Sequence, residues 1–272
     1  MNASSRPFTT WILQAGMTLL WQGRGVVAIS VAVTVLIAAL SIVMPGPALL
    51  DDDGAINLIG AIWQGGLFVI YAIPLIPVAY GAHIAVLRGE VGFAALQSQG
   101  WTGMMRFGRA MIFAAVMLAM LINLYQLVFV QDLLLMTAGR IDAARAVRLI
   151  LGGAVAFLVL AIVVLFGTWG AMSLQVGQVG QVKVGDVLAI GRENFCFLAW
   201  RITAVVLVLP VLSALVLPMM GQVVAVMVAL GMPADPAFLI VRSAFSGLIA
   251  CFAVILISVT FCRAWLRSVN AS

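Results

Sequence analysis

The chain has 272 residues, of which 65% are hydrophobic and only 8% are charged, and its mean hydropathy is +1.22. An ordinary soluble domain carries roughly 25% charged residues, so a water-soluble fold of this size has no means of burying so much apolar surface. The formal net charge is +5, but basic blocks with interleaved aromatics are missing, which argues against a nucleic-acid partner. The composition indicates an integral membrane protein.

Six charge-free stretches are long enough to cross a bilayer, for which about 20 apolar residues suffice. They are Gly25 to Met44, Gly54 to Leu87, and the runs between Arg109 and Asp132, Arg148 and Lys183, Arg201 and Asp235, and Arg242 and Arg263. Lipid offers the backbone no hydrogen-bond partner, and the runs lack the alternation of barrel strands, so each is expected to be a helix. The expected fold class is an all-α integral membrane protein with six transmembrane helices in one polytopic domain, residues 1–272. The first run is expected to be a retained helix, because its end is a poor signal-peptidase site.

The distribution of basic residues predicts the orientation, because lysine and arginine are retained on the cytoplasmic side during insertion. With the N-terminus inside, the segments on the outer side carry four arginines: Arg140, Arg145, Arg148 and Arg242. The other ten basic residues then lie inside, while most acidic residues lie outside. Both termini are therefore expected to be cytoplasmic, in the cell (inner or plasma) membrane.

The sequence also contains an internal repeat of roughly 90 residues. Placing Phe8, Phe93 and Gly185 in register brings three arginines to within a residue of one column, each before an odd-numbered span: Arg24, Arg109 and Arg201. Each unit opens with a semi-polar stretch in which tryptophan lies near arginine, as suits a membrane interface. We expect three tandem helical hairpins, approximately residues 8–90, 91–182 and 183–270, each preceded by a short interfacial helix and anchored at the cytoplasmic interface by its arginine. Plain duplication and a pore on a pseudo-threefold axis both account for such a repeat.

Groups that support chemistry are scarce in these spans. No ionisable residue is expected inside any of them, and His83, the only histidine, is expected at the inner interface, which removes the usual support for proton-driven transport. Neither a nucleophile–base set nor metal-ligand spacing is present, and Asp51 to Asp53 is best explained as a solvated loop. The three cysteines fit small apolar positions. We therefore expect no enzymatic activity, no cofactor and no metal.

Uncharged polar residues and prolines are the remaining candidates. The intramembrane amides are Gln64, Asn123, Gln126 and Gln222. Such amides commonly join helices and contribute about 0.6 to 2 kcal/mol each, and a substrate site is the alternative role. Four prolines are candidate helix kinks: Pro74, Pro77, Pro210 and Pro218.

Two functions remain open. The first is a non-enzymatic membrane scaffold or accessory subunit that packs against other membrane proteins, lipids or copies of itself. The second is a permease or channel-like transport subunit for a neutral or apolar solute, which requires a polar cavity reaching between the helices. A tightly packed, dry bundle would exclude the second function.

Overall fold

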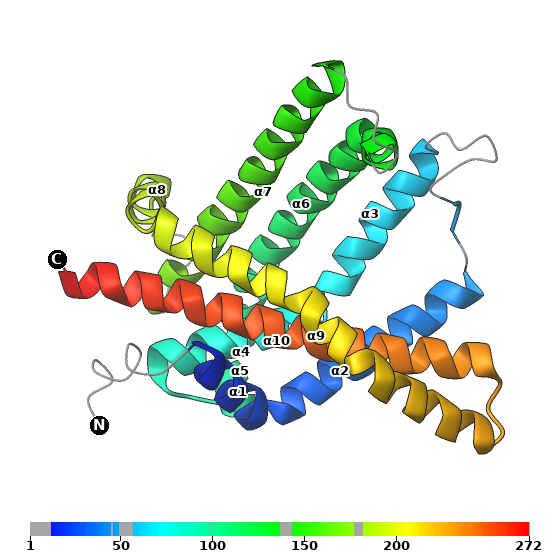
Figure 1. Cartoon of the computed structure of the whole chain (residues 1–272). Helices are drawn as coiled ribbons and strands as arrows, with labels where there is room; N and C mark the ends of the chain where they lie inside the picture. Colours follow the sequence, from blue (N-terminus) through cyan, green and yellow to red (C-terminus); the bar gives the residue numbers. More distant parts are fainter. Residues whose placement is uncertain are drawn as a thin grey trace.

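Figure 1 shows the computed structural model of the chain, which describes residues 12–44, 46–48, 57–98, 100–136, 143–176 and 182–271. Within these ranges the chain is helical and no strand occurs. The helices are, in order, α1 (Ile12–Gln22), α2 (Arg24–Val43), α3 (Leu58–Ala72), α4 (Leu75–Arg88), α5 (Gly92–Gln97), α6 (Gly100–Met136), α7 (Ala143–Val176), α8 (Val184–Glu193), α9 (Phe195–Ala229) and α10 (Ala234–Ala271). The all-α class expected from the sequence is confirmed.

Five of these helices, α2, α6, α7, α9 and α10, are long and apolar enough to cross a membrane. Their apolar segments have mean hydropathies between 1.8 and 2.5. The bent pair α3 and α4 makes a sixth if it crosses as one span. The described residues therefore have the helices of a multi-pass membrane protein, with five or six candidate spans.

A proline separates α3 from α4. The two helices meet at an angle of 42° at Ile73 and Pro74. Because proline lacks the backbone N–H and its ring crowds the preceding turn, it weakens a helix at this point. Pro77 lies in the first turn of α4, where a missing N–H costs little. The bend takes the chain from α3, which packs on α6, to α4, which packs on α10.

The long helices form two layers that run in different directions (Figure 1). Helices α3, α6 and α7 lie side by side in one layer, whereas α2 and α9 flank α10 in the other. In the view of Figure 1 the layers cross at a steep angle. Helix α10 has 38 residues and a length of about 57 Å at 1.5 Å per residue, well beyond the ~30 Å hydrocarbon core, so it has to tilt or protrude.

Helix α10 is the centre of the core. Of its apolar segment 56% is buried, against 11% for α9, and it packs on α1, α2, α4, α7 and α9. Cys251, Ile255 and Val259 of α10 form one cluster with Val26 of α2 and Val78 of α4. On the α7 side, a Cβ at Gly167 would overlap the ring of Phe261, so this glycine permits close approach of the two helices.

Short helices precede three of the long ones: α1 before α2, α5 before α6, and α8 before α9. The first and third breaks are single residues in similar backbone conformations, Gly23 (φ −90°, ψ 12°) and Asn194 (φ −99°, ψ 10°). The Asn194 amide Nδ2 donates to Ile190 O at 3.1 Å and to Ser268 Oγ of α10 at 3.2 Å. The break before α9 is thereby tied to the core helix.

Candidate functional site

A cavity of about 530 Å³ lies between α2, the α3–α4 junction and α10. This volume falls within the ~300–1,000 Å³ that small-molecule sites occupy. Its polar lining comes from three helices: Thr34 and Ser41 of α2, Tyr71 of α3, and Arg242, Ser243 and Ser246 of α10. The cavity combines one cation with several hydroxyls in a largely apolar surround that includes Phe68, Leu75 and Leu239.

The local structure of α2 orients two of these hydroxyls. Thr34 Oγ1 donates to Ser30 O at 2.9 Å, and Ser41 Oγ donates to Ala38 O at 2.7 Å. Both hydrogens are used within the helix, as is common for hydroxyls in apolar helices, and the oxygen lone pairs remain available as acceptors. One turn earlier on α2, the Ser30 hydroxyl is buried and has no hydrogen-bond partner in the structure.

The cationic residue of the cavity is Arg242. Its side chain is exposed, and no carboxylate among the described residues lies within ion-pairing distance of it. Arg242 lies eight residues into α10, about 12 Å along the helix axis. A guanidinium group carries five N–H donors, so an unpaired one beside hydroxyls is suited to an oxyanion.

Arg242 lies within an apolar helical segment of 36 residues, which is longer than a bilayer crossing needs, so the expectation that no ionisable residue lies inside a span stays a prediction. The last apolar segment runs from Ala234 to Val269 and includes Arg242, which the sequence interpretation used as the outer boundary of the span. The helix begins earlier because Pro236 occupies its first turn, where proline is well tolerated. Arg242 is therefore part of the helix surface.

The candidate amides are not brought together in this cavity. Asn123 of α6 packs against α3, since a Cβ at Gly65 would lie 2.5 Å from Asn123 Nδ2. Gln64, next to that glycine, is exposed, and so is Gln222 on α9. The side chain of Gln126 lies outside the described residues. None of the described amides lines the cavity.

The repeat arginines occupy helix surfaces. The Arg24 guanidinium lies over the Trp21 ring at 4.9 Å, and that of Arg201 over the Phe197 ring at 3.6 Å. Arg201 Nη1 also donates to Phe197 O at 3.4 Å, and Arg267 of α10 approaches the same ring at 5.7 Å. Arg109 is exposed on α6. The other candidate kinks, Pro210 and Pro218, lie inside α9, which continues through both.

His83 is buried in the helix packing, which the sequence did not predict, while the interfacial depth expected for it stays a prediction. It is only 4% exposed, its Nδ1–H donates to Ala79 O at 2.8 Å, and its ring lies edge-on to Phe107 at 5.2 Å. Gly170 of α7 leaves room for both rings. Sequence position could not reveal this, because it fixes how far His83 lies along α4 and leaves open which helices pack around it.

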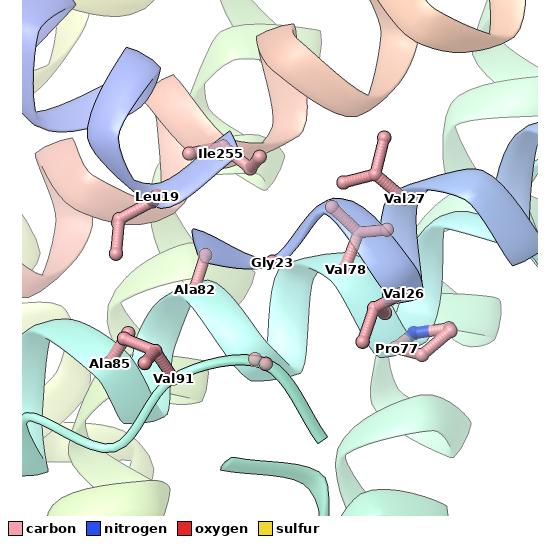
Figure 2. A pocket seen from close by; sticks show the side chains of 12 residues that line it. Leu19, Gly23, Val26, Val27, Pro77, Val78, Ala82, Ala85, Val91 and Ile255 are labelled. Atoms are coloured by element: carbon pink, nitrogen blue, oxygen red, sulfur yellow. The ribbon is translucent and has the colours of Figure 1, made fainter. Parts of the chain in front are cut away.

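A second void, shown in Figure 2, lies where the α1–α2 break meets α4. It encloses about 30 Å³ and is lined by apolar side chains and glycines, among them Val26, Pro77, Gly81 and Ile255. That volume is close to the space of one water molecule, and the lining offers few polar partners. It is a packing void and has no capacity for a ligand.

Comparison with known proteins assigns neither a family nor a function to this chain. Comparison with protein-family models, curated proteins and solved structures finds no match for this chain. Within the described residues, no group of three or more His, Cys, Asp or Glu side chains is arranged to hold a metal ion. A functional proposal therefore rests on the cavity and the residues that line it.

Proposed function

We propose that the chain is a non-enzymatic, permease-like membrane subunit that binds a small amphiphilic anion in the cavity between α2, the α3–α4 junction and α10. The observation that carries this proposal is Arg242, which has no carboxylate partner among the described residues and lies beside Ser243 and Ser246 in the cavity lining. The sequence hypothesis of transport named a neutral or apolar solute, and the position of Arg242 supports an anion in its place.

The energetics favour such a role for Arg242. Charged residues within apolar membrane helices are costly, by about 2.5–3.5 kcal/mol at the helix centre on insertion scales and less toward the ends, so they usually face a water-filled cavity and serve a substrate path. Arg242 lies toward the first end of α10 and faces such a cavity. A carboxylate or phosphate would satisfy the guanidinium, and the hydroxyls of Tyr71 and Ser246 offer further hydrogen-bond donors. The apolar walls at Phe68 and Leu75 suit a short hydrocarbon portion of the same solute.

We also propose the finer membrane arrangement. The three units are tandem helical hairpins, α1, α5 and α8 lie at the cytoplasmic interface, and both termini are cytoplasmic. Three tryptophans near the starts of α2, α6 and α9 support this: Trp21, Trp101 and Trp200 are 70%, 70% and 71% exposed. Exposed indole rings near arginines favour headgroup depth.

A second candidate is a scaffold or accessory subunit. It is favoured by the outer face of α9, where large apolar side chains such as Val211, Leu215 and Leu217 are more than half exposed. Little besides α10 packs on this helix. A neighbouring membrane protein, lipid or second copy of the chain would dock there.

Binding of octanoate to the purified protein in lipid nanodiscs tests the proposal. We expect octanoate to raise the melting temperature and to bind the wild type, and Arg242→Gln to weaken binding at least tenfold while Arg242→Lys retains part of it. Octanol and octylamine separate charge from hydrophobicity, and Arg106→Gln, an exposed arginine on α6, is the matched control. Equal octanoate binding by wild type and Arg242→Gln, or equal binding of octanol and octanoate, overturns the proposal.

A further inference from the structure

An apolar groove of about 590 Å³ lies on the other side of the α2–α10 pair, walled by α1. Its sides are formed by Met17 and Leu20 of α1, Val31 of α2, and Phe245 and Leu248 of α10. By helical periodicity, these α10 residues face away from Ser243 and Ser246, so the groove is separate from the polar cavity.

Close packing fixes α1 as the third wall. A Cβ at Gly16 would lie 2.5 Å from Leu256 Cδ2 and 3.3 Å from Phe252 Cε2 of α10. Glycine therefore lets α1 rest directly on the core helix. The groove is bounded by three helices, whereas ordinary lipid-facing surface offers one or two, so an occupant is enclosed over more of its area.

One end of the groove carries the only charge in its lining, Arg24. The Arg24 guanidinium is exposed at the first turn of α2 and lies 4.9 Å from the centre of the Trp21 ring. No carboxylate among the residues that the structure describes pairs with it. Tryptophan and arginine together favour the level of the lipid headgroups, where arginine stays hydrated and contacts phosphate.

We propose that this groove is a binding site for an anionic glycerophospholipid, with one acyl chain between α1, α2 and α10 and the headgroup phosphate on Arg24. The apolar lining of the groove suits a hydrocarbon chain, and the single cation in that lining complements the negative headgroup. The surrounding bilayer supplies this ligand at high local concentration. The site is independent of the anion proposed for the Arg242 cavity.

Native mass spectrometry of the detergent-purified protein with added phosphatidylglycerol or phosphatidylcholine tests the site. We expect the wild type to retain phosphatidylglycerol preferentially, Arg24→Gln to lose the preference by about tenfold, and Ala28→Phe, which fills the groove, to lose bound lipid of both kinds. Arg106→Gln and Arg242→Gln should bind as the wild type does, which separates this site from the cavity. Melting temperatures of all variants verify folding.

Three results overturn the inference. The first is equal retention of the two lipids by the wild type. The second is unchanged phosphatidylglycerol binding by both Arg24→Gln and Ala28→Phe. The third is a lipid-free wild type whose groove is covered by a second copy, seen as a dimer that Ala28→Phe converts to monomer.

Discussion

Gly247 of α10 lies directly against Thr34 of α2, and a Cβ at position 247 would be 3.3 Å from both Cβ and Cγ2 of Thr34. Both residues also line the polar cavity. The contact therefore sets how closely α2 and α10 approach at the cavity wall. A side chain at 247 has to push the two helices apart or enter the cavity.

Gly247→Leu is expected to lower the melting temperature of the detergent-solubilised protein and to weaken binding in the cavity. Overpacking of a close helix contact costs about 1–3 kcal/mol. Gly221→Leu on α9 is the control, because a Cβ there meets nothing within 4 Å. A melting temperature for Gly247→Leu equal to that of the wild type would show that α2 and α10 are not in close contact.

Gly81→Ala is expected to stabilise the protein. Gly81 lies inside α4 beside the small void of Figure 2, and a Cβ there comes no closer than 3.9 Å to Leu96 Cδ2. Alanine in a helix interior is favoured over glycine by roughly 0.5–1 kcal/mol, and the added methyl fills empty space. Thermal unfolding checks this, and Gly167→Ala, which meets the Phe261 ring, should shift the melting temperature downward.

Substitutions at His83 distinguish packing from a polar role. His83→Phe should retain the stability of the wild type, because the ring contact with Phe107 is kept. The bond from Nδ1 to Ala79 O is lost, but this carbonyl still accepts the backbone N–H of residue 83 within α4. His83→Ala opens a hole beside Phe107 and should cost about 2–5 kcal/mol. Equal loss of stability in the two variants, measured by thermal unfolding, would mean that the imidazole nitrogens are needed.

Asn194 and Ser268 are expected to be energetically coupled. Asn194→Ala removes the bond to Ser268 Oγ and the bond to Ile190 O, each worth about 0.5–1.5 kcal/mol. In a double-mutant cycle with Ser268→Ala, the stability losses should sum to more than the loss in the double variant. Strict additivity would exclude a direct bond between α10 and the break before α9.

Hydropathy predicted the helical class and the approximate spans because lipid forces the backbone of any crossing segment into a helix. It could not predict which helix is central. The apolar segments of α9 and α10 have mean hydropathies of 2.5 and 2.4, yet 11% of one and 56% of the other is buried. In lipid, buried and exposed faces are equally apolar, so hydropathy does not separate them.

The candidate site was missed for the same reason. Amides were singled out as the polar groups within the spans, whereas the cavity collects serines, a threonine and Arg242 from helices distant in sequence. Hydroxyls that bond within their own helix give no hydropathy signal. Pro236 before Arg242 was the available clue, since an early proline is compatible with a helix that begins upstream.

Under the proposed orientation, α10 starts on the outer side and Arg242 lies near that start, so the cavity is expected to open on the face opposite the termini. Thiol labelling of Ser246→Cys tests this most directly. Ser246 lines the cavity and is exposed, and the native Cys196, exposed near the start of α9, lies on the cytoplasmic face in the proposed arrangement. In intact cells, a membrane-impermeant maleimide should modify Cys at position 246 and leave Cys196 unmodified until the cells are permeabilised. Labelling of Cys196 in intact cells, or no labelling at position 246 under either condition, would contradict the account.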